Sequence, residues 1–149
     1  MKTIKQVLEA KGNAVLTISP DRSVYDAVKT MADKGVGALI VLEEGKVVGL
    51  ISERDYARKI ILKGLSSPKT SVRDIMATRV VYARPELTIE EGLALITEKR
   101  CRHLPVMENE QLLGILSIGD LVKAAIAEKT YMIDQLENYI TGTFPEPAS

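Results

Sequence analysis

Two short motifs in the sequence have the residue types and the spacing to bind a sugar phosphate. Each reads Gly-x-x-Ser-x-x-Asp, once from Gly49 to Asp55 and again from Gly114 to Asp120. A short carboxylate at the start of a helix suits the two hydroxyl donors of a ribose, and the free N–H groups there suit phosphate. The same pattern is also typical of a capping box, with Ser at the N-cap and an acid three residues later. Taken singly, each motif leaves both interpretations open.

Three basic side chains are further candidates for anion binding. Arg54 lies inside the first motif, where the second has Gly119. Its guanidinium is suited to a phosphate, although an arginine in a first helical turn also pairs with a neighbour such as Glu53. Arg102 precedes a buried-looking strand, and His103 is the only side chain with an unperturbed pKa near neutrality. A lone histidine is more often structural than functional.

The composition excludes several classes of function. The 149 residues carry 20 Lys and Arg against 20 Asp and Glu, and the aromatic residues are five Tyr and one Phe. Nucleic-acid binding by phosphate neutralisation or base stacking is therefore not expected. One Cys and one His cannot build a structural zinc site or an internal disulfide, and Cys101 is expected to be a small core residue without a redox role. No apolar run is long enough for a membrane span, and no secretory leader follows Met1, so we expect a cytoplasmic protein.

An internal repeat carries both motifs. A shift of 65 positions places residues 15–62 on residues 80–127 without a gap, with ten identities and conserved polarity at most other pairs. The segments 4–8 and 72–76 match at a shift of 68, so the first copy has three extra residues around Lys11. Each copy therefore provides one Gly-x-x-Ser-x-x-Asp motif.

Each copy predicts the same order of elements, β-α-β-β-α. Strands are expected at 14–18 and 80–83, at 38–42 and 103–107, and at 47–51 and 112–116, the last two in each copy forming a hairpin. Ser23 and Thr88 stand at the N-caps of amphipathic helices, and further helices start at Ser52 and Ser117. Pro105 indicates that its strand is an edge. The fold class is α+β (α/β), with two repeats packed together.

The same pattern predicts the boundaries of the parts. We expect a first domain at 1–63 with its lead-in helix, a linker at 64–71, a second domain at 72–127, a C-terminal helix at 128–141 and a disordered tail at 142–149. The C-terminal helix has an apolar stripe and no counterpart in the repeat. It either folds back on its own core or contacts a second chain.

These residues resemble the cystathionine-β-synthase (CBS) domain, present here as the tandem pair called a Bateman module. The resemblance rests on residues 36–41 and 102–106, on the two Gly-x-x-Ser-x-x-Asp motifs, and on the lead-in 72–76, and it covers roughly 3–127. It is strongest to small stand-alone CBS-pair proteins. It implies a pseudo-two-fold module of two repeats with an extra C-terminal helix, and modules of this kind usually dimerise.

The resemblance also implies a site. In this family the Asp of the motif binds ribose and the Ser lies near phosphates, which assigns Asp55, Asp120, Ser52 and Ser117. A basic residue before the second strand often contacts phosphate, as Arg102 would, and adenine lies in an apolar slot that uses backbone groups. With Arg54 and His103, the remaining site residues are then Thr17, Ser19, Val36, Gly37, Ala38, Tyr82 and Arg84.

The expected function is a non-catalytic sensor of an adenine nucleotide (AMP, ADP, ATP or NAD) that needs no cofactor or metal and acts as a homodimer on an unknown regulated protein. No P-loop or catalytic motif is present, and Gly35-Val36-Gly37 fails as a dinucleotide fingerprint because Ile40 replaces its third glycine. Two alternatives stay open. One is a scaffolding CBS-pair dimer with vestigial sites, and the other is a small enzyme that hydrolyses or transfers a nucleotide.

Overall fold

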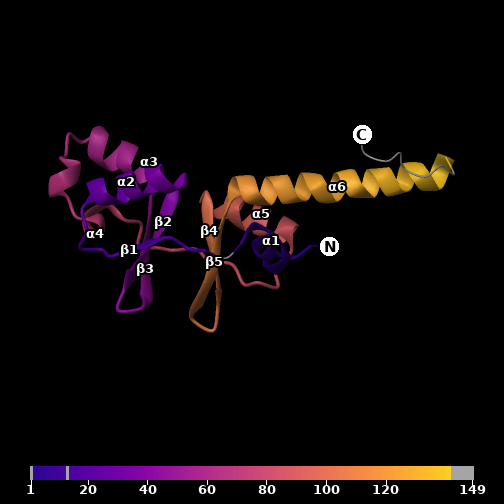
Figure 1. The fold of residues 1–149 in the computed structure, drawn as a ribbon, viewed down its shortest axis with the longest axis horizontal. Coiled ribbons are helices and arrows are strands. Elements are labelled where there is room, and N and C mark those ends of the chain that lie inside the picture. The colour runs from indigo at the N-terminus through magenta and orange to yellow at the C-terminus, as the bar shows by residue number, and fades with distance from the viewer. Residues whose placement is uncertain (1, 13, 142–149) are drawn as a thin grey trace.

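The computed structural model describes residues 2–12 and 14–141 and confirms an α+β fold built from two similar halves side by side (Figure 1). The first half contains β1 (Thr17–Ile18), α2 (Val24–Lys34), β2 (Ala38–Glu43), β3 (Lys46–Ser52), α3 (Glu53–Asp55) and a π-helical turn (Tyr56–Ile61). The second contains α5 (Ile89–Lys99), β4 (His103–Glu108), β5 (Gln111–Ser117) and α6 (Ile118–Thr141). Two lead-in helices, α1 (Ile4–Lys11) and α4 (Val72–Ile75), and a 3₁₀ turn (Ser67–Lys69) complete the order.

The principal helices begin at the predicted N-caps. Ser23 Oγ accepts a hydrogen bond from the amide of Asp26 at 3.1 Å, at the start of α2. Thr88 Oγ1 accepts from the amide of Glu91 at 3.1 Å, and the Glu91 carboxylate accepts in return from the amide of Thr88 at 3.2 Å. These local side-chain bonds satisfy amides that have no partner inside the helix, which is why the sequence signal was reliable.

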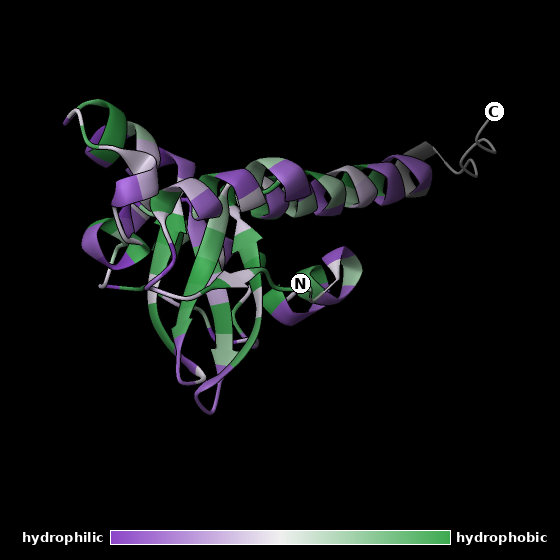
Figure 2. Cartoon of the chain, turned by 60° about the vertical axis from the view of Figure 1, so that its left-hand side comes forward, coloured by the Kyte–Doolittle hydropathy of each residue, from purple (hydrophilic) through white to green (hydrophobic). Residues whose placement is uncertain are grey.

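The predicted hairpins are also confirmed. Strand β2 pairs antiparallel with β3, and β4 with β5, each with the same register shift in mid-strand. The turns at Glu44-Gly45 and Asn109-Glu110 have positive φ at both residues, as a two-residue type I′ turn requires. Figure 2 shows the apolar strands meeting polar turns at one end of the molecule.

The first predicted strand of each copy is shorter than expected. The first copy has only Thr17–Ile18 parallel to β2, and the second has a single bridge between Ala83 and Val106. In the first copy the amide of Ile40 donates to the carbonyl of Leu16 at 3.2 Å. The repeat places Pro105 at the position of Ile40, and proline has no N–H to donate. The prediction of a strand at 80–83 is therefore wrong, while the edge predicted at Pro105 agrees with a two-stranded sheet of β4 and β5.

Each lead-in helix packs in the core of the other repeat. Ile4, Val7 and Leu8 of α1 are buried with the second copy, and Val72 and Ile75 of α4 with the first. Backbone bonds fix the exchange, for example from Ile4 N to Leu87 O at 2.7 Å and from Val72 N to Arg22 O at 2.9 Å. The sequence order had assigned the lead-in helix of residues 1–63 to the first domain, but its apolar face completes the core of the second.

The predicted C-terminal helix is confirmed, but no break separates it from the last helix of the second repeat. Helix α6 runs through both, because no Gly or Pro lies between Leu121 and Thr141. Its second half extends past the rest of the molecule (Figure 1). The predicted tail at 142–149 lies outside the described residues. Among those described, no helix has the length and apolarity needed to cross a bilayer.

Candidate functional site

Both Ser-x-x-Asp motifs form capping boxes. Asp55 Oδ2 accepts from Ser52 N at 3.0 Å and from Ser52 Oγ at 3.1 Å, and the amide of Asp55 donates to Ser52 Oγ at 3.2 Å. Asp120 Oδ2 accepts from Ser117 N at 2.8 Å, and the amide of Asp120 donates to Ser117 Oγ at 3.1 Å. The capping interpretation is therefore confirmed, and it fixes each carboxylate beside the end of a strand.

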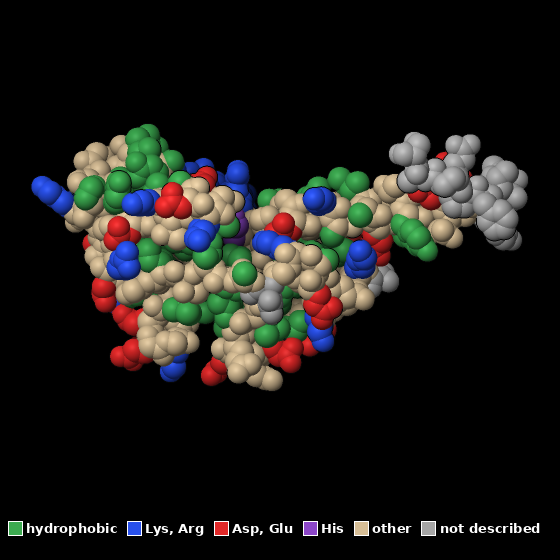
Figure 3. Space-filling view, viewed as in Figure 1, with side chains coloured by type: hydrophobic (Ala, Val, Ile, Leu, Met, Phe, Trp, Pro, Cys, Tyr) green, Lys and Arg blue, Asp and Glu red, His purple; other side chains and the backbone are tan. Residues whose placement is uncertain are grey.

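The first motif lies in a cleft of about 890 Å³ between the two repeats. Residues of α3 and the end of β3 form one wall, and the segments before α5 and β4 of the other repeat form the opposite wall. The structure brings together six of the candidate residues here: Gly37, Ser52, Arg54, Asp55, Arg102 and His103. Figure 3 shows a notch between the repeats with basic side chains at its edge.

The cleft has an excess of positive charge. Five cationic side chains line it against three carboxylates, and none of the five forms a salt bridge within the described part of the chain; the five are Arg54, Arg79, Lys99, Arg100 and Arg102. Unpaired guanidinium groups around one cavity attract an anion and can bind its oxygens bidentately. Arg100 also has a left-handed backbone, with φ of 54°, at the end of α5.

Sequence reasoning missed three of these cations, namely Arg79, Lys99 and Arg100. A signal for Arg79 was present, because the lead-in shift of 68 positions pairs it with Lys11. Lys99 and Arg100 end the amphipathic helix of the second repeat, where basic residues are usual, so their types alone did not distinguish them.

His103 and Cys101 lie on the same wall of the cleft. A Cβ placed on Gly37 would stand 3.3 Å from His103 Nε2, so the ring meets the backbone of the first repeat. Burial, followed by the charge of Lys11, lowers the pKa of His103. Burial raises the pKa of the Cys101 thiol, which also packs against the second core. A neutral thiol in this setting agrees with a packing role.

The second motif has a different environment. Lys11 Nζ donates to Asp120 Oδ2 at 2.7 Å and to the carbonyl of Ile115 at 3.0 Å. Partial burial alone would raise the pKa of Asp120, but the hydrogen bonds from Lys11 and Ser117 outweigh it, and the pKa is lowered. The two motifs are thus equivalent by sequence and unequal in their surroundings.

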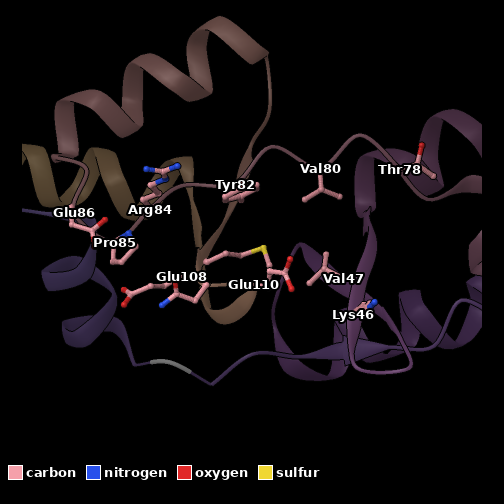
Figure 4. A pocket seen from close by; sticks show the side chains of 12 residues that line it. Lys46, Val47, Thr78, Val80, Tyr82, Arg84, Pro85, Glu86, Glu108 and Glu110 are labelled. Carbon is pink, nitrogen blue, oxygen red and sulfur yellow. The ribbon is translucent and has the colours of Figure 1, made fainter.

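The remaining candidates of the sequence analysis do not line the cleft beside Asp55. Tyr82 and Arg84 line a separate cleft of about 950 Å³ beside the hairpin turns (Figure 4), which shares only Val80 with the first. Apart from Ser117 and Asp120 of the second motif, four candidates line neither cleft: Thr17 and Ser19 are exposed, Val36 packs against the first core, and Ala38 is buried.

Comparison with known proteins supports this architecture. The family model for the CBS domain matches twice, at residues 11–62 and 72–127. The CBS domain-containing protein CBSX3, mitochondrial, of Arabidopsis thaliana is 39% identical over 95% of this chain and 73% of its own length. A putative signal-transduction protein with CBS domains from Burkholderia ambifaria has 46% identity and a TM-score of 0.82, over 85% of this chain and 95% of its own.

A more distant structure carries ligands. The CBS domain pair of protein MJ0100, in complex with 5′-methylthioadenosine and S-adenosyl-L-methionine, has a TM-score of 0.76 at 20% identity, over 86% of this chain and 98% of its own. At that identity the likeness is one of fold. The family model matches twice, each match contains one of the repeated motifs, and the two repeats together form the cleft. This chain is therefore a tandem CBS-domain protein and belongs to the CBS family.

Proposed function

We propose that the protein is a non-catalytic regulatory module that binds an adenine nucleotide in the cleft beside Asp55. The observation that carries this proposal is the cleft itself, in which the carboxylate fixed by Ser52 lies among five cations that form no salt bridge with the described residues. Two further carboxylates, Glu53 and Glu98, leave an excess of positive charge. A carboxylate is an acceptor for two ribose hydroxyls, and guanidinium groups are donors for phosphate. No other described cavity combines these two chemistries at one Ser-x-x-Asp motif.

The charge of the cleft favours a phosphorylated ligand. A nucleoside without phosphate would leave several guanidinium groups without a partner, whereas AMP, ADP, ATP or NAD would place anionic oxygens among them. The complex of MJ0100 with two adenosyl compounds supports an adenine-containing ligand in this fold. We therefore rank phosphorylated adenine nucleotides above S-adenosylmethionine for this chain.

Each side chain then has a defined part. Asp55 would accept the ribose hydroxyls, and Ser52 would hold Asp55 in place through the capping box. Arg54 of the first repeat and three arginines of the second, Arg79, Arg100 and Arg102, would bind phosphate. Because the two walls come from different repeats, bound nucleotide would tie the repeats together and favour one arrangement of them.

The output would act on a partner in trans, from a homodimer. Helix α6 carries exposed apolar side chains, among them Ile126, Met132, Ile133 and Leu136, each more than half exposed. Alternating spacings of four and three, the repeat of a coiled-coil seam, join Val122, Ile126, Lys129, Ile133 and Leu136, so this seam is apolar except at Lys129. The α6 helix of a second copy would cover this seam. We retain the cytoplasm as the proposed location of the protein.

One observation favours the scaffolding alternative. The two Ser-x-x-Asp motifs are satisfied as capping boxes without any ligand, and Lys59 Nζ already lies 3.3 Å from Asp55 Oδ1. If the nucleotide sites are vestigial, the exposed face of α6 would be functional and the cleft beside Asp55 would not. Ligand binding separates this alternative from the sensor.

The test is isothermal titration calorimetry and thermal shift with AMP, ADP, ATP, NAD and S-adenosylmethionine. We expect saturable binding of a phosphorylated adenine nucleotide, and loss of at least tenfold in affinity in Asp55→Asn, because a neutral amide is a poorer acceptor for a diol. The control is Asp74→Asn, which removes an exposed acid of α4 outside the cleft. Absence of binding by all five compounds would refute the sensor and leave the scaffold.

A further inference from the structure

A lysine from the N-terminal helix holds the carboxylate of the second motif. Lys11 Nζ donates to Asp120 Oδ2 at 2.7 Å across 109 positions of sequence, and also to the carbonyl of Ile115 at 3.0 Å. Both acceptors belong to the second repeat, one in β5 and one in the first turn of α6. The ammonium therefore lies where the strand meets the helix, which is the place of Asp55 and its cleft in the first repeat.

Asp55 has no such partner from a distant segment among the described residues. The lysine near it is Lys59, four residues along the same helix, at 3.3 Å from Oδ1, and Lys59 Nζ also donates to Ile75 O at 2.8 Å. Arg79, which matches Lys11 in the lead-in alignment, lines the cleft but forms no salt bridge with Asp55. Each aspartate thus contacts one lysine, but the contact at Asp120 is shorter, at 2.7 Å against 3.3 Å, and its lysine comes from a separate helix, α1.

Packing holds Lys11 in place. It is the last residue of α1, whose Val7 and Leu8 are buried in the second core. Leu8 lies against Gly114, and a Cβ on that glycine would be 2.5 Å from Leu8 Cδ1. An ammonium on a helix anchored beside its acceptor acts at a high effective concentration, so it competes with a free ligand for the same oxygen.

We propose that Lys11 is a specificity-determining residue that competes with ribose for Asp120 and makes the two nucleotide sites unequal. The proposal rests on the proposed function, in which these aspartates accept ribose hydroxyls. A diol needs the carboxylate oxygens as acceptors, and Oδ2 of Asp120 already accepts from Lys11 and from Ser117 N. The Asp55 cleft fills first, and a ligand at Asp120 has to displace the lysine.

The experiment isolates the second site in an Asp55→Asn background and titrates it with AMP by calorimetry. We expect K11M in that background to bind AMP about fivefold more tightly, since a partly exposed ion pair of this kind is displaced at modest cost. Lys5→Met is the matched control, because it removes the same charge from an exposed position of α1 away from Asp120. K11M combined with Asp120→Asn should lose the gain.

The sign of the change decides the matter. AMP is an anion, so removing a lysine that merely attracts it, or binds its phosphate, would weaken binding; weaker or unchanged binding in K11M overturns the proposal. If the Asp55→Asn chain does not fold, the ratio of the second to the first dissociation constant is compared between wild type and K11M, and it should fall about fivefold, because only the second site binds more tightly. If AMP does not bind to wild type, the titration is repeated with ADP, ATP and NAD; absence of binding by all of these and by S-adenosylmethionine refutes the proposed function itself, a result distinct from an unchanged ratio.

Discussion

Gly49 and Ala77 approach so closely that a Cβ on Gly49 would lie 2.9 Å from the carbonyl oxygen of Ala77. That carbonyl also accepts from the amide of Leu50 at 3.0 Å, so the lead-in of the second repeat is bonded to β3 of the first. The equivalent Gly114 meets a side chain, that of Leu8, instead of backbone. The contact shows how the exchanged lead-in segments are held against the strands that carry the two motifs.

The two glycines should therefore respond differently to alanine. G49A forces a Cβ against backbone and should lower the free energy of unfolding by about 1–3 kcal/mol. In G114A the new Cβ meets the end of the Leu8 side chain, so this substitution should lower the free energy of unfolding by less. In the double variant with Leu8→Ala the shorter side chain should remove the contact, and G114A should then cost less than it does alone. Urea unfolding of wild type, G49A, G114A, Leu8→Ala and the double variant measures this. Equal costs at the two glycines would contradict the difference in contact.

Replacing Arg100 with glycine should make the fold more stable and the binding of nucleotide weaker. Its φ of 54° is left-handed, and its repeat partner Gly35 has φ of 66°. R100G should raise the free energy of unfolding by about 0.5 kcal/mol, because glycine adopts this backbone without strain but loses more entropy on folding. The same variant should bind ATP about tenfold more weakly through loss of a charge-assisted bond.

The control for this pair of effects is R100N, which tolerates the left-handed backbone and also lacks the charge. It should lose binding as R100G does. Thermal unfolding and calorimetry on the same samples give both numbers. A loss of stability in R100G would contradict the strain at the left-handed backbone, and full ATP affinity in both variants would remove Arg100 from the proposed site.

His103 should make stability depend on pH below neutrality. Its folded pKa is lowered from an ordinary value of 6.5 by burial and by Lys11, against the opposing charges of Asp120 and Glu53. The unfolded chain then binds the proton more readily, so this contribution is complete above pH 6.5 and declines as the pH falls through the folded pKa. In H103Q the slope of unfolding free energy between pH 7 and pH 5 should be smaller, which chemical unfolding at each pH measures. An unchanged slope would mean that carboxylates, and not His103, cause the pH dependence of the free energy of unfolding.

Helix α6 should mediate self-association. I133D places a charge in the middle of the exposed apolar seam and should shift a dimer toward monomer by at least tenfold in dissociation constant, because an unpaired charge would be buried. Asn138→Asp is the control, since five residues rotate the position about 140° around the helix and Asn138 does not line the apolar hollow that contains Ile133. Light scattering and sedimentation across a concentration series check this. A monomeric wild type, or equal effects of both variants, would contradict it.

Local features explain which parts of the fold could be predicted. The N-caps at Ser23 and Thr88 and the hairpin turns depend on hydrogen bonds within a few residues, so residue type and spacing were sufficient. The strand expected at 80–83 failed because its bond needed an amide on residue 105, which belongs to another strand and is a proline. Of the cleft, the motif residues were predicted, whereas Lys99 and Arg100 became recognisable only once the chain had folded around Asp55.

The sequence by itself determined the repeat, the two motifs, the elements of each copy and membership of the CBS family, because these are patterns along the chain. Only the tertiary structure decided which core each lead-in helix completes and which charges face each aspartate. The apolar face of a short helix such as α1 fits either of two similar cores, so its sequence does not say which one it joins. Once α1 packs on the second repeat, Lys11 reaches Asp120, and two motifs that are alike in sequence become different in chemistry.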